Sequence, residues 1–140
     1  MLKGPLTHPA LIGALAAAGH GSRVLIADGN YPHSTGAREG ATRIHLNLRA
    51  GLPTVDDVID VLVQAIPIEA ATVMVPEGDE KVAAHAGFRL ALPEGVAWTE
   101  LGRFDFYDAC KSDDLAILIA TGEQRIYANL LLTVGVRAAD

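Results

Sequence analysis

The stretch AAAGHGSRVLIADGNYP, residues 16–32, joins two kinds of secondary structure. It begins in a helical run that we expect to close at Gly19, a residue suited to the left-handed conformation that ends many helices. It continues in Val24–Ala27, an apolar run typical of a buried strand. Asp28–Asn30 come directly after this strand, at the kind of position where a sheet places polar side chains beside a crevice. The stretch therefore predicts a helix-to-strand connection with a polar site at the end of the strand.

His20 lies in the turn before this strand, and Asp28 follows the strand. The glycines on both sides have no side chains and leave the imidazole accessible. An imidazole changes charge near neutral pH, which suits acid/base chemistry. The alternative is that His20 is an ordinary surface residue of a loop. Eight residues of extended chain span about 26 Å. Either a further turn or a second subunit must therefore bring the two side chains together.

Composition predicts one compact domain over residues 1–140. Half of the residues are hydrophobic and 20% are charged, which is too apolar for a disordered chain. The net charge of −6 argues against nucleic acid and anionic membranes as partners, because both require a basic face. We expect no metal and no membrane span: the histidines lack paired ligand spacing, and no apolar run reaches about 18 residues.

The single cysteine, Cys110, cannot form an internal disulfide and falls in a predicted helix. It is most simply a packed, reduced thiol. The N-terminal segment lacks the continuous apolar core of a signal peptide. These features lead us to expect a cytoplasmic protein.

Helical and strand patterns alternate along the chain. The predicted helices cover residues 9–19, 54–66, 79–86 and 103–111. The predicted strands cover residues 23–28, 42–47, 71–75, 96–101, 115–120 and 130–134. We expect strand 42–47 to pair near strand 23–28, and the helix at 79–86 to be ended by Gly87.

Leu115–Ala120 is the most apolar run, and it predicts a strand buried on both faces in the middle of the sheet. The connection from this strand to Leu130–Val134 is too short for a crossover helix, so the sheet should be mixed. The pattern predicts an α/β fold, a three-layer α/β/α domain with a mixed central sheet.

Motifs for other chemistries are missing from the sequence. Gly19–Gly21 precedes a strand and lacks a third glycine, so it does not form a dinucleotide-binding loop. There is no phosphate-binding loop, and no serine or cysteine motif predicts a nucleophile. Acid/base chemistry by His20 remains, with polar side chains suited to a polyhydroxylated ligand.

Four motifs, in order along nearly the whole chain, are similar to the D-ribose pyranase and L-fucose mutarotase family. They are Gly19-His20-Gly21, the segment Leu25–Pro32, the segment Arg103–Tyr107, and Thr121-Gly122-Glu123 followed by Tyr127-Ala128-Asn129. The resemblance implies a family-specific α/β/α fold. It also implies rings of subunits that often pair face to face, as in a decamer.

The resemblance further implies the roles of single residues. His20 maps onto the catalytic acid/base. The positions implied to bind substrate are Asp28, Arg103, Tyr127, Ala128 and Asn129. The implied activity is that of an isomerase, a mutarotase that interconverts the anomers of L-fucose or a related aldose without a cofactor. Arg103 and the aromatic residues after it resemble the fucose branch.

Two positions depart from the family pattern: Ser22 replaces the usual acidic residue, and Gly29 replaces a common alanine. The preferred sugar can therefore differ from both named sugars. The alternative function is a non-catalytic sugar-binding or transport-accessory protein, which would tolerate loss of His20. We also expect Phe104 and Phe106 to lie in the core rather than against a ligand.

Overall fold

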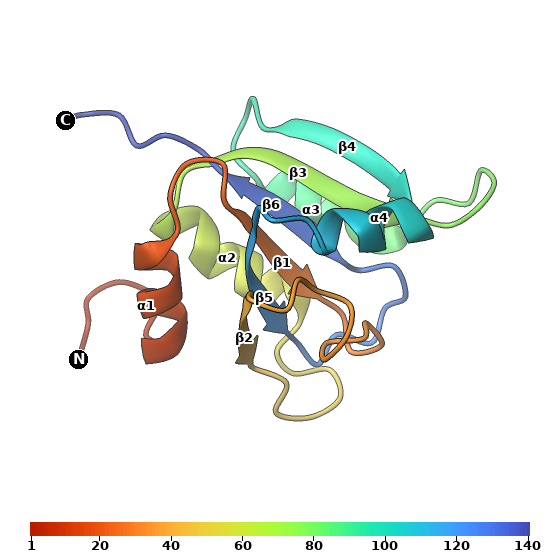
Figure 1. Ribbon diagram of the computed structural model, residues 1–140, viewed down its shortest axis with the longest axis horizontal. Helices are drawn as coiled ribbons and strands as arrows, with labels where there is room; N and C mark the ends of the chain where they lie inside the picture. The colour runs from red at the N-terminus through yellow and green to blue at the C-terminus, as the bar shows by residue number, and fades with distance from the viewer.

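The computed structural model describes residues 1–140 and shows a six-stranded mixed sheet with helices on both faces (Figure 1). The helices are α1 (Pro9–Ala17), α2 (Val55–Ala65), α3 (Ala83–Ala91) and α4 (Arg103–Cys110). The strands are β1 (Arg23–Ala27), β2 (Thr42–His45), β3 (Ile68–Val75), β4 (Ala97–Gly102), β5 (Leu115–Ala120) and β6 (Leu130–Val134). The predicted three-layer α/β fold with a mixed sheet is confirmed.

The strand order is β2-β5-β1-β6-β3-β4, and β6 alone runs antiparallel to its neighbours. The carboxyl ends of the other five strands and the amino end of β6 therefore share one edge of the sheet, here called the carboxyl edge. The predicted place of Leu115–Ala120 in the middle of the sheet is wrong. Because β6 inserts between β1 and β3, the two central strands are β1 and β6. Strand β5 separates β2 from β1.

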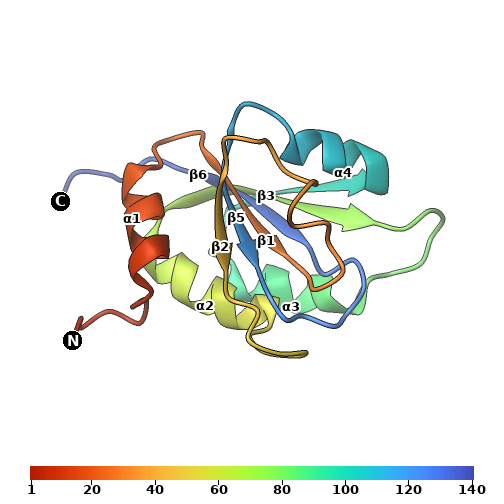
Figure 2. The ribbon, with the colours of Figure 1, turned by 60° about the horizontal axis from the view of Figure 1, so that its bottom comes forward.

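The two faces of the sheet are covered differently (Figure 2). Helices α1, α2 and α3 pack on one face, where they bury alternate residues of β1 such as Val24 and Ile26. Helix α4 and the loop of residues 28–41 cover the other face, where they contact Leu25 and Ala27. The period-two alternation of a strand thus supplies both hydrophobic cores.

Arg43 on β2 holds the loop of residues 28–41 against the sheet. Its guanidinium donates to several loop carbonyl groups, with the shortest bond of 2.9 Å from Nε to the His33 oxygen. These bonds satisfy backbone acceptors that no strand or helix pairs. The loop can therefore serve as a layer of the fold.

The helix boundaries follow local capping chemistry. Helix α1 has Pro9 in its first turn, as predicted, and His8 accepts a hydrogen bond from the amide of Leu11 as its N-cap. The prediction that Gly19 takes the left-handed conformation at the helix end is wrong: α1 ends at Ala17, and the positive φ, 82°, belongs to Gly21. None of the helices has the length and hydropathy needed to cross a bilayer.

Helix α3 differs from its predicted range of 79–86. It begins at Ala83 and continues through Gly87 to Ala91. Burial of Phe88 against the sheet outweighs the weak helix propensity of Gly87. The left-handed turn lies earlier, at Gly78, with a φ of 85°.

Candidate functional site

A cavity of about 320 Å³ with a mixed polar and apolar lining opens at the carboxyl edge of the sheet, within the size range of small-ligand sites. The loop after β1, the end of β3, helix α4 and the turn before β6 contribute to it. The residues that line it are Asp28, Asn30, Tyr31, Met74, Arg103, Tyr107, Ile126, Tyr127 and Asn129. Four of the five predicted substrate-binding residues thus surround one cavity.

Asp28 and Asn129 form a buried pair at the base of this cavity. The Asn129 amide nitrogen donates to Asp28 Oδ2 at 3.0 Å, and Asn129 Oδ1 accepts from the Asp28 backbone amide at 2.8 Å. Both residues are 3% exposed. This reciprocal bonding joins the end of β1 to the start of β6 and orients both side chains.

The other Asp28 oxygen, Oδ1, accepts the backbone amides of Asn30 and Tyr31 at 3.0 and 2.9 Å. Burial raises the pKa of Asp28, although its four hydrogen bonds act in the opposite direction. Asp28 therefore shapes the loop after β1 and also lines the cavity.

Tyr127 has the only positive φ among the non-glycine residues, 58°. This left-handed conformation is costly for a tyrosine and persists only where neighbouring contacts enforce it. The next residue, Ala128, is fully buried. Ala128 lies between Tyr127 and Asn129, which line the cavity, but does not line it itself.

Arg103 begins helix α4 and is exposed at the rim of the cavity. Its Nε donates to the Tyr107 hydroxyl at 3.3 Å, one turn along the helix, and this bond raises the pKa of Arg103. The guanidinium therefore supplies a permanent positive charge. Phe106 is buried as predicted, but the prediction for Phe104 is wrong, because this side chain is 72% exposed beside Arg103.

His20 does not reach this cavity. It lies before β1, at the opposite edge of the sheet, where its Nε2 is 3.0 Å from Glu69 Oε2 at the start of β3. Both side chains are about half exposed. Of the two routes left open by the sequence, a further turn therefore does not bring His20 and Asp28 together in this chain. The sequence analysis missed Glu69, since no local motif links residues so far apart.

Glu123 and Arg125 form an ion pair that the sequence analysis did not identify, although it included the Thr121-Gly122-Glu123 motif. Arg125 donates from Nε to Glu123 Oε1 at 3.0 Å and from Nη2 to Oε2 at 2.7 Å. Its Nη2 also contacts Asp56 in the first turn of α2. Glu123 Oε2 accepts the Val55 amide at 3.3 Å. The network ties the turn before β6 to the start of α2.

The Glu123 network predicts a pH dependence of stability. Burial opposes ionisation of Glu123, but the bonds from Arg125 and Val55 prevail and lower its pKa from 4.5 to about 2. As pH falls from about 4.5 towards 2, the unfolded chain takes up this proton before the folded one does. Urea unfolding should therefore show stability being lost across this interval. Glu123→Gln should flatten the dependence, and an identical slope in both proteins would contradict the assignment.

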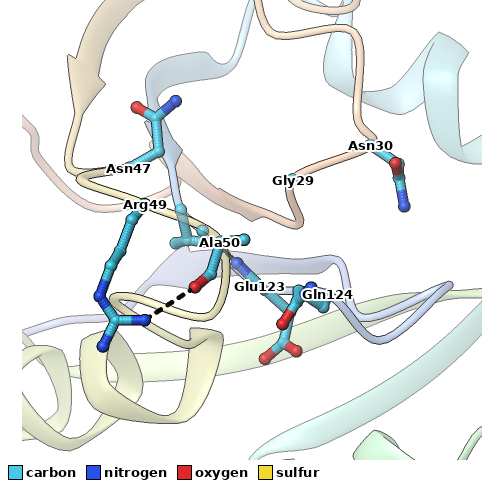
Figure 3. Close-up of a pocket in the computed structure, with 9 residues that line it drawn as sticks. Gly29, Asn30, Asn47, Arg49, Ala50, Glu123 and Gln124 are labelled. Atoms are coloured by element: carbon cyan, nitrogen blue, oxygen red, sulfur yellow. Dashed lines mark hydrogen bonds between the residues drawn. The ribbon is translucent and has the colours of Figure 1, made fainter.

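A second cavity, of about 430 Å³, lies beside the first and shares Asn30 with it (Figure 3). Asn30, Asn47 and Arg49 point in different directions there, and the bond drawn for Arg49 is to the neighbouring carbonyl of Ala50. The donors do not converge on a common point. No cluster of three or more His, Cys, Asp or Glu side chains has the geometry to hold a metal ion.

The fold defines a three-layer α/β protein with a cavity of small-ligand size at the carboxyl edge of its sheet. Residues 1–137 match the RbsD / FucU transport protein family. The chain belongs to this family, as its motifs predicted, and the family includes sugar mutarotases.

Some relatives are named for ribose and others for fucose, and the two groups match this chain at similar sequence identity. D-ribose pyranase 2 of Streptomyces griseus is 33% identical, with 97% of this chain and 98% of the relative covered. Fucose mutarotase of Bos taurus is 31% identical, with 99% and 95% covered. Two solved structures each have a TM-score of 0.83 and 26% identity, covering 99% of this chain and 100% of theirs: Bacillus subtilis RbsD with D-ribose and Streptococcus pneumoniae fucose mutarotase with L-fucose.

Proposed function

We propose that the protein is an aldose mutarotase, an isomerase that interconverts the anomers of L-fucose or a closely related monosaccharide. The observation that carries this proposal is the single cavity that gathers Asp28, Arg103, Tyr127 and Asn129. Carboxyl, guanidinium, phenol and amide groups together offer both donors and acceptors, as a ring of sugar hydroxyls requires.

Anomer exchange requires only proton transfer. A proton leaves the anomeric hydroxyl, another reaches the ring oxygen, the ring opens, the C1–C2 bond rotates and the ring closes. His20 is the acid/base for these transfers, because one imidazole serves both directions near neutral pH. Asp28, Arg103, Tyr127 and Asn129 hold the remaining hydroxyls, and the exposed Phe104 beside Arg103 is available to an apolar sugar face.

A homo-oligomer completes the site in this proposal. Within one chain the sheet separates His20 from the cavity, so a neighbouring subunit must supply the imidazole. Ring assemblies repeat the same contact between successive subunits and can place one edge of a sheet against the opposite edge of the next. The exposed apolar side chains of Phe104 and Ile126 next to the cavity are consistent with a covering neighbour.

The direct test of activity is saturation-transfer NMR of α/β exchange with L-fucose, D-ribose, galactose and rhamnose, with and without protein. We expect the largest acceleration for L-fucose or a sugar of the same stereochemistry, because the segment that begins at Arg103 resembles that of the fucose mutarotase branch of the family. Folded protein that accelerates exchange of no aldose would favour the alternative.

The alternative is a non-catalytic sugar-binding protein. The structure offers one observation in its favour: the cavity of a single chain contains no imidazole. In that case isothermal titration would show that native protein and a His20 variant bind sugar equally well. Neither protein would accelerate the exchange of anomers.

The oligomer proposal gives a prediction that separates the two functions. Light scattering should report a mass several-fold above 14.7 kDa. Coexpression of His20→Ala and Arg103→Ala chains should then restore exchange at low sugar concentration. In a randomly mixed ring about a quarter of the shared sites contain both native residues. A fully active monomer, or no recovery in verified mixed oligomers, would contradict a site shared between subunits.

A further inference from the structure

The turn of residues 124–129 carries three residues that line the cavity, Ile126, Tyr127 and Asn129, and residues outside the cavity contact it. Tyr127 is held with a φ of 58°. A tyrosine released from such a conformation would return to negative φ and redirect its side chain. Asn129 is secured by Asp28, but this bond acts two residues beyond Tyr127. Other contacts must therefore hold Tyr127 itself.

His85 supplies one of these contacts from helix α3. Its Nε2 lies 3.2 Å from the Tyr127 carbonyl oxygen, which can only accept, so this nitrogen carries the proton. The imidazole is 9% exposed and packs against Phe88 and Trp98, with ring centroids 6.0 Å away in each case. Burial lowers the pKa of His85 and so favours the neutral ring, whereas the bond to Tyr127 acts in the opposite direction. The packed ring thus presents a fixed donor to the turn.

Arg125 fixes the turn at a second point, two residues before Tyr127, as the Asp28–Asn129 bond fixes it two residues after. Its guanidinium is bonded by two nitrogens to Glu123, and its backbone amide donates to Glu123 Oε1 at 2.9 Å. The further contact with Asp56 anchors the same side chain to α2. Neither His85 nor Arg125 lines the sugar cavity.

We propose that His85 and Arg125 are positioning residues that set the sugar affinity of the cavity by holding Tyr127 in its left-handed conformation. The proposal rests on the proposed function, since it assumes that Tyr127 contacts a sugar. His85 on α3 and the Arg125 contact with α2 affect the cavity by holding the backbone of the turn, and neither side chain has to touch the ligand. Loss of either contact should weaken binding and leave the proton-transfer step largely intact.

The first test compares two replacements of His85 by titration with L-fucose, or with the aldose that the NMR comparison selects. His85→Leu keeps apolar packing but removes the donor, and we expect Kd and KM to rise about tenfold while kcat changes less than about twofold. His85→Gln places a donor at similar reach and should recover most of the affinity. His45→Leu is the control, because His45 is exposed and its side chain is not hydrogen-bonded. Equal affinity in His85→Leu and the native protein would overturn the proposal.

The second test uses Arg125→Gln, which removes the positive charge but keeps a side-chain amide that can donate to the buried Glu123 carboxylate. The matched control is Arg137→Gln, since Arg137 pairs with Asp140 at the exposed C-terminal end. We expect Arg125→Gln alone to raise Kd several-fold. The Tyr127 backbone chemical shifts should move in both Arg125→Gln and His85→Leu, even in the absence of sugar.

The shift measurement separates this inference from the proposed function. Native protein that binds no aldose would refute the proposed function and, with it, the claim about affinity. Tyr127 shifts that stay at their native values in both variants would refute the positioning claim whatever the protein binds. A loss of stability in His85→Leu with native shifts and native Kd would show a purely structural role and would also overturn the proposal.

Discussion

Replacing His20 with alanine is expected to lower the rate of anomer exchange by about 10²-fold or more, the usual contribution of a positioned acid/base. Sugar affinity should change little, because the residues proposed to hold the sugar hydroxyls, which include Asp28, Arg103 and Asn129, all remain in place. His20→Asn retains hydrogen bonding but cannot transfer a proton, so it should be nearly as inactive. Saturation-transfer NMR measures the rate, and titration calorimetry measures the affinity.

The control for this experiment is His45→Ala, which removes another exposed imidazole. Arg103→Ala and Asp28→Asn provide the complementary comparison, since they should weaken binding more than they slow the bound sugar's exchange. If His20→Ala kept native rates while Arg103→Ala abolished them, the proton-transfer role would belong to another residue.

Replacing Asn129 with leucine is expected to destabilise the fold by about 3 kcal/mol. The leucine side chain fills a similar volume but leaves the buried Asp28 carboxylate without its Asn129 donor and the Asp28 amide without an acceptor. Unpaired polar groups at 3% exposure cannot recover these bonds from water. Urea unfolding followed by circular dichroism measures the loss, and sugar binding should fall with it because Asp28 loses its orientation.

Asn47→Leu is the matched control, because Asn47 is exposed and its side chain is not hydrogen-bonded. Its free energy of unfolding should stay within about 0.5 kcal/mol of the native value. Equal stability of Asn129→Leu and Asn47→Leu would show that the Asp28–Asn129 pair does not hold β1 to the turn before β6.

Much of the fold follows from local sequence patterns. The apolar run of β1, the Pro9 start of α1 and the Thr54 capping box of α2 each involve residues within a few positions of one another. The short connection from β5 to β6 also excludes a crossover helix, so the mixed sheet was predictable. Errors arose where packing outweighed propensity, as in α3, which continues through Gly87 because Phe88 is buried.

The sequence by itself determined the α/β class, the family motifs and the separation of His20 from Asp28, because an extended strand has a known length. Only the tertiary structure decided that β6 lies between β1 and β3, and hence that Asn129 meets Asp28 across 101 positions of the chain. The same holds for the contact of His85 with Tyr127 and of Arg125 with Asp56. Such contacts depend on which strands pair and which helices cover them, and a local pattern cannot contain that information.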